Sequence, residues 1–255
     1  CITVMERLGV IGKPSDWLIA SCVKKQDVER LFGMQVVDIP MDEVLSLGEV
    51  ESGKVGAERI YGRLKEIVTK YDLQGLTLRC FDLLKTVKNT GCWALAKLNE
   101  EQIPAACEGD VPTLITMMLC QRLTGCSGFQ ANPARIEHLQ NGRCRLLLAH
   151  CTIPLQMVET CSLTTHFESG IGVAIHGEVP GGDYTLLKVG VRDEKMRVFA
   201  EDVQLISNQY EPLLCRTQVW LDAPDTVADY LLHDPIANHH VIVPGYWSKK
   251  FRTWC

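Results

Sequence analysis

Three residues with metal-binding side chains, Glu108, His150 and His239, each stand at the end of a short apolar run that is typical of a buried strand. Side chains at strand ends are free to converge on one point. One carboxylate and two imidazoles form a ligand set that suits a divalent transition metal and leaves positions open for a substrate. No HExxH or similar local motif occurs, so the metal site is a hypothesis that rests on strand positions.

Glu108 is the first functional candidate because of where it stands. It follows the apolar run 105–107, and apolar residues at helical spacing predict a helix over 111–124. The carboxyl end of a strand that faces a helix N-terminus is where α/β proteins place their chemistry. Asp110 has an ordinary structural interpretation as the N-cap of that helix, with Pro112 in the first turn and Gly125 as the stop. Glu108 has no comparable capping role.

The elements that must position these residues change in character along the chain. Strands are expected at 8–11, 34–40, 75–80 and 105–107, and helices or helical turns at 24–32, 41–47, 55–71, 81–84, 93–98 and 111–124. This alternation predicts βαβ units and a parallel sheet.

The second half is mainly antiparallel in its pattern. Strands are expected at 127–131, 145–150, 172–176, 184–188, 196–200, 203–206 and 217–221, with a helix at 226–232 and a hairpin turn at 180–183. The predicted class is α/β: a Rossmann-like parallel-sheet domain over residues 1–150, then a mainly antiparallel, barrel-like β-rich domain over residues 151–255. The change between them is expected between about residues 125 and 170.

The composition narrows the class of protein. The net charge of −5 over 255 residues, without a Lys/Arg stripe, argues against a nucleic-acid partner. No apolar run reaches the roughly 18 residues that a membrane span needs, and the first residues lack the layout of a signal peptide. The 12 cysteines show no Cys-x-x-Cys pair, which indicates reduced thiols and predicts a cytoplasmic protein. Both ends of the chain look like cuts in something longer.

Seven segments spread along most of the chain carry a family resemblance. They are Gly12-Lys-Pro-Ser-Asp-Trp-Leu18, Arg79-Cys-Phe-Asp82, Cys107-Glu-Gly-Asp110, Ala149-His-Cys-Thr-Ile-Pro154, His166-Phe-Glu-Ser-Gly-Ile-Gly172, Cys215-Arg-Thr-Gln-Val219 and Ala237-Asn-His239. In this order they resemble the L-fucose isomerase and L-arabinose isomerase superfamily, especially its fucose-isomerase-related members. In that family two α/β domains precede a β-rich domain, and the metal site lies between the last two. The resemblance implies that this chain corresponds to those last two domains and lacks the N-terminal one.

The resemblance also implies roles for individual residues. Glu108 matches the glutamate that binds Mn²⁺ and serves as acid and base, and His150 matches an additional histidine ligand of the arabinose isomerases. His239 matches the C-terminal histidine ligand, with His240 as the alternative if the register slips by one. Asn132 falls where the family has its second acidic ligand and base. An amide there is a departure that puts catalysis in question, because an amide cannot accept a proton near neutral pH.

The implied reaction is aldose–ketose isomerisation of a pentose or 6-deoxyhexose through an enediol, in which a metal stabilises charge and carboxylates move the proton. Glu168 is a candidate second base, although a structural carboxylate in a turn is an equal interpretation. The alternatives are a non-catalytic or regulatory sugar-binding protein with a degraded acid/base pair, and an enzyme of another reaction type on the same scaffold. The family further implies a homo-oligomer, either a trimer or a hexamer.

Overall fold

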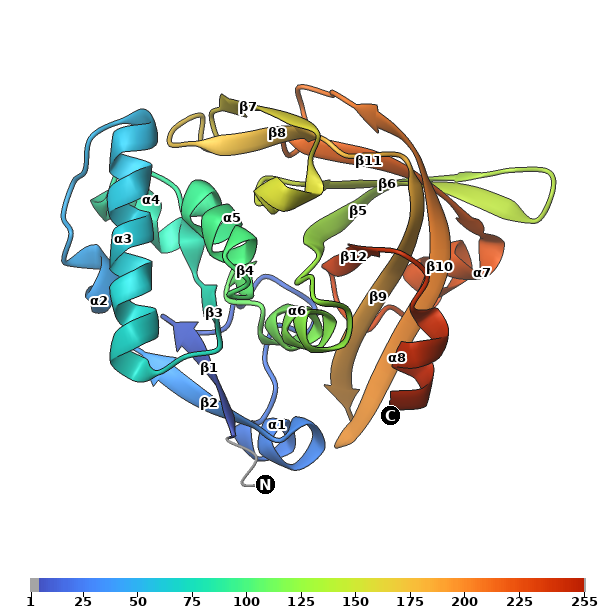
Figure 1. The fold of residues 1–255 in the computed structure, drawn as a ribbon, viewed down its shortest axis with the longest axis horizontal. Helices are drawn as coiled ribbons and strands as arrows, with labels where there is room; N and C mark the ends of the chain where they lie inside the picture. The colour runs from blue at the N-terminus through green and yellow to red at the C-terminus, as the bar shows by residue number, and fades with distance from the viewer. Residues whose placement is uncertain (1–4, 255) are drawn as a thin grey trace.

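A four-stranded parallel sheet forms the first part of the chain (Figure 1). In the computed structural model, which describes residues 5–254, the strand order is β2 (Met34–Ile39), β1 (Glu6–Ile11), β3 (Gly75–Leu78) and β4 (Ala105–Cys107). All neighbouring pairs are parallel. The prediction of a parallel sheet is therefore confirmed, and the carboxyl ends of its strands meet at one edge.

Helices cover both faces of this sheet because its strands are apolar on both faces. Ala105 and Cys107 pack with α3 and α5 on one face, whereas Ala106 packs with α1 and α6 on the other. The helical elements of this half are α1 (Lys25–Phe32), α2 (Asp42–Leu45), α3 (Gly53–Tyr71), the 3₁₀ turn η1 (Cys80–Asp82), α4 (Leu83–Thr86), α5 (Cys92–Glu100) and α6 (Val111–Thr124).

A closed antiparallel barrel forms the rest, with the strand order β10-β11-β6-β5-β12-β9. Its strands are β5 (Phe129–His138), β6 (Arg143–His150), β9 (Gly182–Arg192), β10 (Lys195–Gln209), β11 (Thr217–Pro224) and β12 (His240–Pro244). The remaining elements are η2 (Leu155–Met157), the pair β7 (Thr160–Thr164) and β8 (Ala174–Glu178), and the helices α7 (Asp225–His233) and α8 (Ser248–Trp254).

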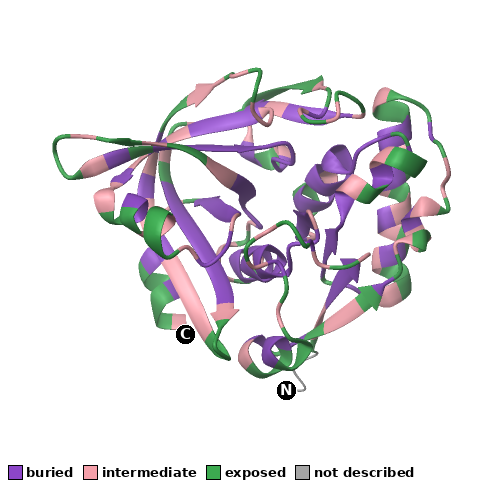
Figure 2. Cartoon of the chain, turned by 180° about the vertical axis from the view of Figure 1, so that it is seen from behind, coloured by how far each residue is buried: buried purple, intermediate pink, exposed green. Residues whose placement is uncertain are grey.

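Helix α6 lies between the sheet and the barrel, and one hydrophobic cluster around it contains residues of both parts. Its residues 111–120 are all buried, as the central helix of Figure 2 shows. The helix packs against Ala106 of β4 on one side and against Leu187 and Val241 of the barrel on the other. A helix that is enclosed on every side must be apolar all round, which explains why its sequence shows little amphipathic pattern.

Two local expectations were wrong. The strands expected at 196–200 and 203–206 are one continuous strand, β10, because Glu201 and Asp202 stay in the ladder opposite β9. Asp202 remains there because Thr185 and Ser248 donate hydrogen bonds to its carboxylate. The turn at 180–183 makes no hairpin, since β8 pairs with β7 and β9 pairs with β10 and β12. The β9–β10 hairpin instead turns at Asp193 and Glu194, which both have positive φ, at 51° and 60°.

The change from parallel to antiparallel pairing comes early in the expected range, between α6 and β5. Strands β5 and β6, which the division at residue 150 assigned to the first domain, lie in the barrel. Whether residues 1–150 and 151–255 are independent domains stays a prediction. Within residues 5–254, no helix is long and apolar enough to cross a membrane.

Candidate metal centre

Glu108 stands in a tight turn between β4 and α6. Glu108 and Gly109 both have a φ of 63°. A Cβ on Gly109 would lie 2.7 Å from the carbonyl oxygen of Lys13, so this position needs glycine both for its φ and for the close approach. Glu108 is not a glycine, and its positive φ therefore carries a cost: a left-handed conformation costs a residue with a side chain roughly 1–2 kcal/mol. Local strain of this kind clusters at functional sites.

The turn brings Glu108 to two histidines from the barrel. Its Oε1 lies 3.4 Å from Nε2 of His239 and 3.8 Å from Nε2 of His150. One ligand atom from each of the three residues lies within 4.8 Å of the others. The two imidazoles meet edge to face, with ring centroids 5.2 Å apart. The structure thus brings together three of the four predicted ligands, from three separate strand ends.

The outer nitrogen of each imidazole has its own partner. Nδ1 of His239 lies 2.8 Å from Oδ2 of Asp110, and Nδ1 of His150 lies 2.9 Å from Oγ1 of Thr152. A carboxylate can only accept, so Nδ1 of His239 carries a proton, and Nε2 offers its lone pair to a metal once its own proton is lost. Orientation of this kind by a second carboxylate is common around ligating histidines.

Nε2 of His239 also supplies a test of whether a metal fits. The imidazole is fully buried, and among residues 5–254 its Nε2 has no hydrogen-bond partner. A buried polar atom without a partner is costly unless something else binds it. Nε2 faces the Glu108 carboxylate, whose Oε1 lies 3.4 Å away, and a mixed nitrogen and oxygen donor set suits Mn²⁺, Zn²⁺ or a related ion. The residues therefore fit a divalent metal.

The charges at the site are tightly coupled. Burial alone would raise the pKa of the Glu108 carboxyl, but the two imidazoles beside it hold that pKa far below its usual range. Burial acts to lower the pKa of His239, but the Asp110 and Glu108 carboxylates outweigh it and raise this pKa to about 9. Without a metal, His239 is therefore held as a cation between two carboxylates.

Asp110 has the capping role that the sequence predicts, and a second role that it does not. The carboxylate accepts from the backbone N–H of Thr113 at 2.8 Å, as an N-cap does. The same carboxylate holds His239 and lies 3.6 Å from Nζ of Lys188, which is fully buried. Burial raises the pKa of Asp110, but Lys188 and His239 outweigh it and lower this pKa to about 2. Sequence reasoning missed Lys188 because it lies within an apolar strand.

His240, the alternative ligand, points elsewhere. Its Nε2 lies 3.0 Å from the Tyr230 hydroxyl, and its Nδ1 lies 3.2 Å from the Asn238 carbonyl oxygen. Burial lowers the pKa of His240 to about 3, so this imidazole is neutral. The structure places His239, and not His240, beside Glu108.

Asn132 lies in β5, between β6, which ends at His150, and β12, which begins just after His239. No hydrogen bond joins Asn132 to the cluster among the described residues. Its backbone pairs with Ala149, the neighbour of His150, and the preceding Ala131 pairs with His240, the neighbour of His239. Its side chain borders a cavity of about 450 Å³ that Glu108 does not line. The role of Asn132 as a metal ligand and catalytic residue stays a prediction.

A cavity of about 290 Å³ opens beside Glu108 and is lined also by Trp17, Phe81 and Glu168. The Trp17 indole N–H donates to Oε2 of Glu108 at 3.0 Å. Phe81 meets Trp17 edge to face, with ring centroids 5.5 Å apart. The cavity thus combines an aromatic wall with two carboxylates. Sequence reasoning assigned no role to Trp17, in the loop after β1, or to Phe81, in η1, because only the fold brings these two segments together.

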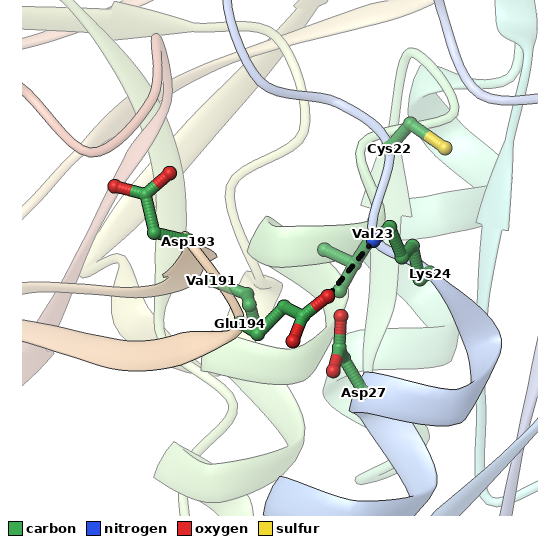
Figure 3. Close-up of a pocket in the computed structure, with 7 residues that line it drawn as sticks. All are labelled: Cys22, Val23, Lys24, Asp27, Val191, Asp193 and Glu194. Atoms are coloured by element: carbon green, nitrogen blue, oxygen red, sulfur yellow. Dashed lines mark hydrogen bonds and ion pairs between the residues drawn. The ribbon is translucent and has the colours of Figure 1, made fainter.

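A larger cavity, of about 560 Å³, lies between the start of α1 and the β9–β10 turn (Figure 3). Two of its three carboxylates have partners: Lys24 pairs with Glu194 at 3.2 Å, and Arg30 pairs with Asp27 at 2.6 Å. None of the three clustered ligands lines it, so this cavity is not part of the candidate metal centre.

Comparison with known proteins gives distant relatives that are sulfoquinovose isomerases. No family model matches the chain. A sulfoquinovose isomerase from Alkalicoccus urumqiensis is 21% identical over 237 residues, which cover 90% of this chain and 53% of the relative. A sulfoquinovose isomerase from Clostridium sp. (strain MSTE9) is 29% identical over 119 residues, which cover 46% of this chain and 25% of the relative. The chain spans about half the length, or less, of the curated relatives that it matches.

Proposed function

We propose that this chain carries the metal centre of a Mn²⁺-dependent aldose–ketose isomerase that acts on a pentose or 6-deoxyhexose. The observation that carries the proposal is the convergence of Glu108, His150 and His239, in which the buried Nε2 of His239 makes no hydrogen bond among the described residues and faces Oε1 of Glu108 at 3.4 Å. The two sulfoquinovose isomerases support the same class of reaction, because their names describe isomerases of a sugar.

In this proposal Glu108, His150 and His239 would hold the ion, which would supply Lewis-acid polarisation of the sugar carbonyl when bound. Glu108 lines the adjoining cavity and carries the proton between the two sugar carbons through an enediol. Trp17 holds Oε2 of Glu108 and so sets the direction of this carboxylate. The aromatic wall offers an apolar face to the C–H groups of a sugar. The cavity of about 290 Å³ is at the small end of ligand pockets, which suits a monosaccharide.

The proposal also includes a specific family. We assign the chain to the L-fucose and L-arabinose isomerase superfamily, with a Rossmann-like first part and with sugar-binding residues supplied by another domain or subunit of a trimer or hexamer. The substrate is then set partly outside this chain. A sulfonated sugar such as sulfoquinovose is included among the substrates to test, because of the two relatives.

Proton exchange with solvent tests the proposal. The Mn²⁺-loaded protein is incubated in D₂O with L-fucose, L-arabinose or sulfoquinovose, and NMR follows ketose formation and deuterium at the sugar carbon next to the carbonyl. We expect both products with the native chain and neither with Glu108→Gln. Sugar binding without ketose or deuterium would contradict the isomerase. Asn132, which replaces a carboxylate of the family, specifically favours a non-catalytic sugar-binding protein in that case.

A further inference from the structure

Two buried cysteines lie directly behind the candidate site. Cys107 ends β4 and immediately precedes Glu108, and Cys80 opens η1 after β3. Their sulfur atoms are 3.1 Å apart, with the Cys107 thiol donating to Sγ of Cys80. The exposed fractions are 8% for Cys80 and 3% for Cys107, and both are free thiols. Neither sulfur has a role in the proposed isomerase chemistry.

We propose that Cys80 and Cys107 form a reversible disulfide when the protein meets a small peroxide, and that this bond displaces the aromatic wall of the cavity. A disulfide needs its sulfurs about 2.05 Å apart, so the pair must approach by only about 1 Å. The two segments are already neighbours in the sheet, because Leu78 pairs with Cys107.

The difference in exposure indicates the order of events. Cys80 is the more exposed thiol, at 8% against 3% for Cys107, so its sulfur is the one that attacks hydrogen peroxide, giving a sulfenic acid while the Cys80 proton joins the released hydroxide as water. The Cys107 sulfur then attacks the Cys80 sulfur and loses its proton, and the sulfenic oxygen leaves as water. Two thiols are oxidised to one disulfide while one peroxide is reduced to two waters.

Cys80 is the partner that we expect to move. Cys107 lies in the sheet, and its N–H donates to the side-chain oxygen of Gln130 at 2.8 Å, whereas Cys80 lies in a single 3₁₀ turn in which its carbonyl oxygen accepts from the Leu83 N–H. Cys80 instead lies between two residues that contact Trp17: the Arg79 guanidinium lies 4.4 Å from the centre of the indole ring, and Phe81 meets it edge to face. A shift of Cys80 therefore acts on Trp17 and on its hydrogen bond to Glu108. The metal ligands keep their strand-end positions.

Peptide mapping tests the disulfide directly. The full Mn²⁺-loaded chain is treated with hydrogen peroxide and digested with trypsin without reduction, which releases Cys80 in peptide 80–85 and Cys107 in peptide 98–122. We expect these peptides to be linked with the loss of two hydrogens, and dithiothreitol to separate them. The link should be absent in Cys80→Ser. It should persist in Cys120→Ser, which removes the other cysteine of the longer peptide. Failure of the native chain to form this link would overturn the proposal.

A second measurement tests whether the aromatic wall formed by Trp17 and Phe81 is displaced. Hydrogen–deuterium exchange of the segment around Trp17 should quicken on oxidation of the native chain and stay unchanged in Cys80→Ser, with Mn²⁺ retained in both. Sugar affinity should fall by about tenfold, as expected for one displaced pocket contact. A linked protein whose exchange near Trp17 is unaltered would refute the effect on the cavity. A protein that isomerises no sugar would refute the proposed function, while the linked peptide and the exchange would still decide this proposal.

Discussion

The contact between Asp110 and His239 makes the sharpest prediction about the metal centre. Asp110→Asn keeps the size of the side chain and the N-cap of α6, since asparagine is as good a cap as aspartate. It removes the charge that holds the proton on Nδ1 of His239 at 2.8 Å. Loss of such an orienting partner typically costs 10- to 100-fold in metal affinity, so we expect Mn²⁺ binding to weaken by about that factor.

The same change should destabilise the metal-free fold for a separate reason. Lys188 is fully buried and lies 3.6 Å from Asp110, which is 1% exposed. Removing one partner of a buried ion pair costs about 3–5 kcal/mol, because the other charge is left uncompensated. Asp110→Asn combined with Lys188→Met removes both charges and should recover most of this loss without recovering metal affinity.

Two measurements on the three proteins separate these effects. Calorimetric titration with Mn²⁺ gives the affinity, and urea unfolding of the metal-free protein gives the stability. Native-like Mn²⁺ affinity in Asp110→Asn would show that Asp110 does not orient a ligand. Recovery of affinity along with stability in the double variant would show that Asp110 acts only through the fold.

Three further predictions concern the same site. The pKa of His239 is raised from 6.5 to about 9, so its charged form stabilises the metal-free fold fully below pH 6.5, and that stability is lost as the pH rises through 9. Mn²⁺ must displace this proton, so titrations should show affinity rising over the same window, and a flat profile would contradict the assignment. Asn132→Asp should raise both Mn²⁺ affinity and sugar turnover, because a carboxylate adds charge and an acid/base group worth typically 10²–10⁴-fold in rate; slower turnover would mean that Asn132 is an adapted residue. Trp17→Phe keeps an aromatic ring but loses the N–H to Glu108, and should lower kcat/KM by about tenfold at unchanged Mn²⁺ content; an unchanged kcat/KM would remove Trp17 from the positioning of Glu108.

Much of the fold could be predicted from the sequence, because it depends on local patterns. The apolar run before Glu108 and the Asp110 cap indicated β4 and α6, and both are present. The three clustered ligands were found because each follows or precedes such a run. Their convergence depends on the barrel packing against the sheet through α6, which no local pattern reports.

The residues that sequence reasoning missed share one property: their roles arise only from long-range contacts. Lys188 looks like a polar interruption in an apolar strand until the fold places it 3.6 Å from Asp110. Trp17 is 91 positions from Glu108 in the sequence and donates a hydrogen bond to it. The 180–183 segment has turn-forming residues, yet which strands pair is decided by closure of the barrel and not by the turn.

Anomalous scattering from crystals soaked with Mn²⁺ tests the central claim most directly. We predict one strong peak within coordinating distance of Glu108, His150 and His239, at the point that Nε2 of His239 faces, and its loss in His239→Gln. Two results would contradict the metal centre and the isomerase proposed from it. One is a peak confined to the cavity of about 560 Å³ between α1 and the β9–β10 turn, and the other is no peak at the three-residue cluster under saturating Mn²⁺.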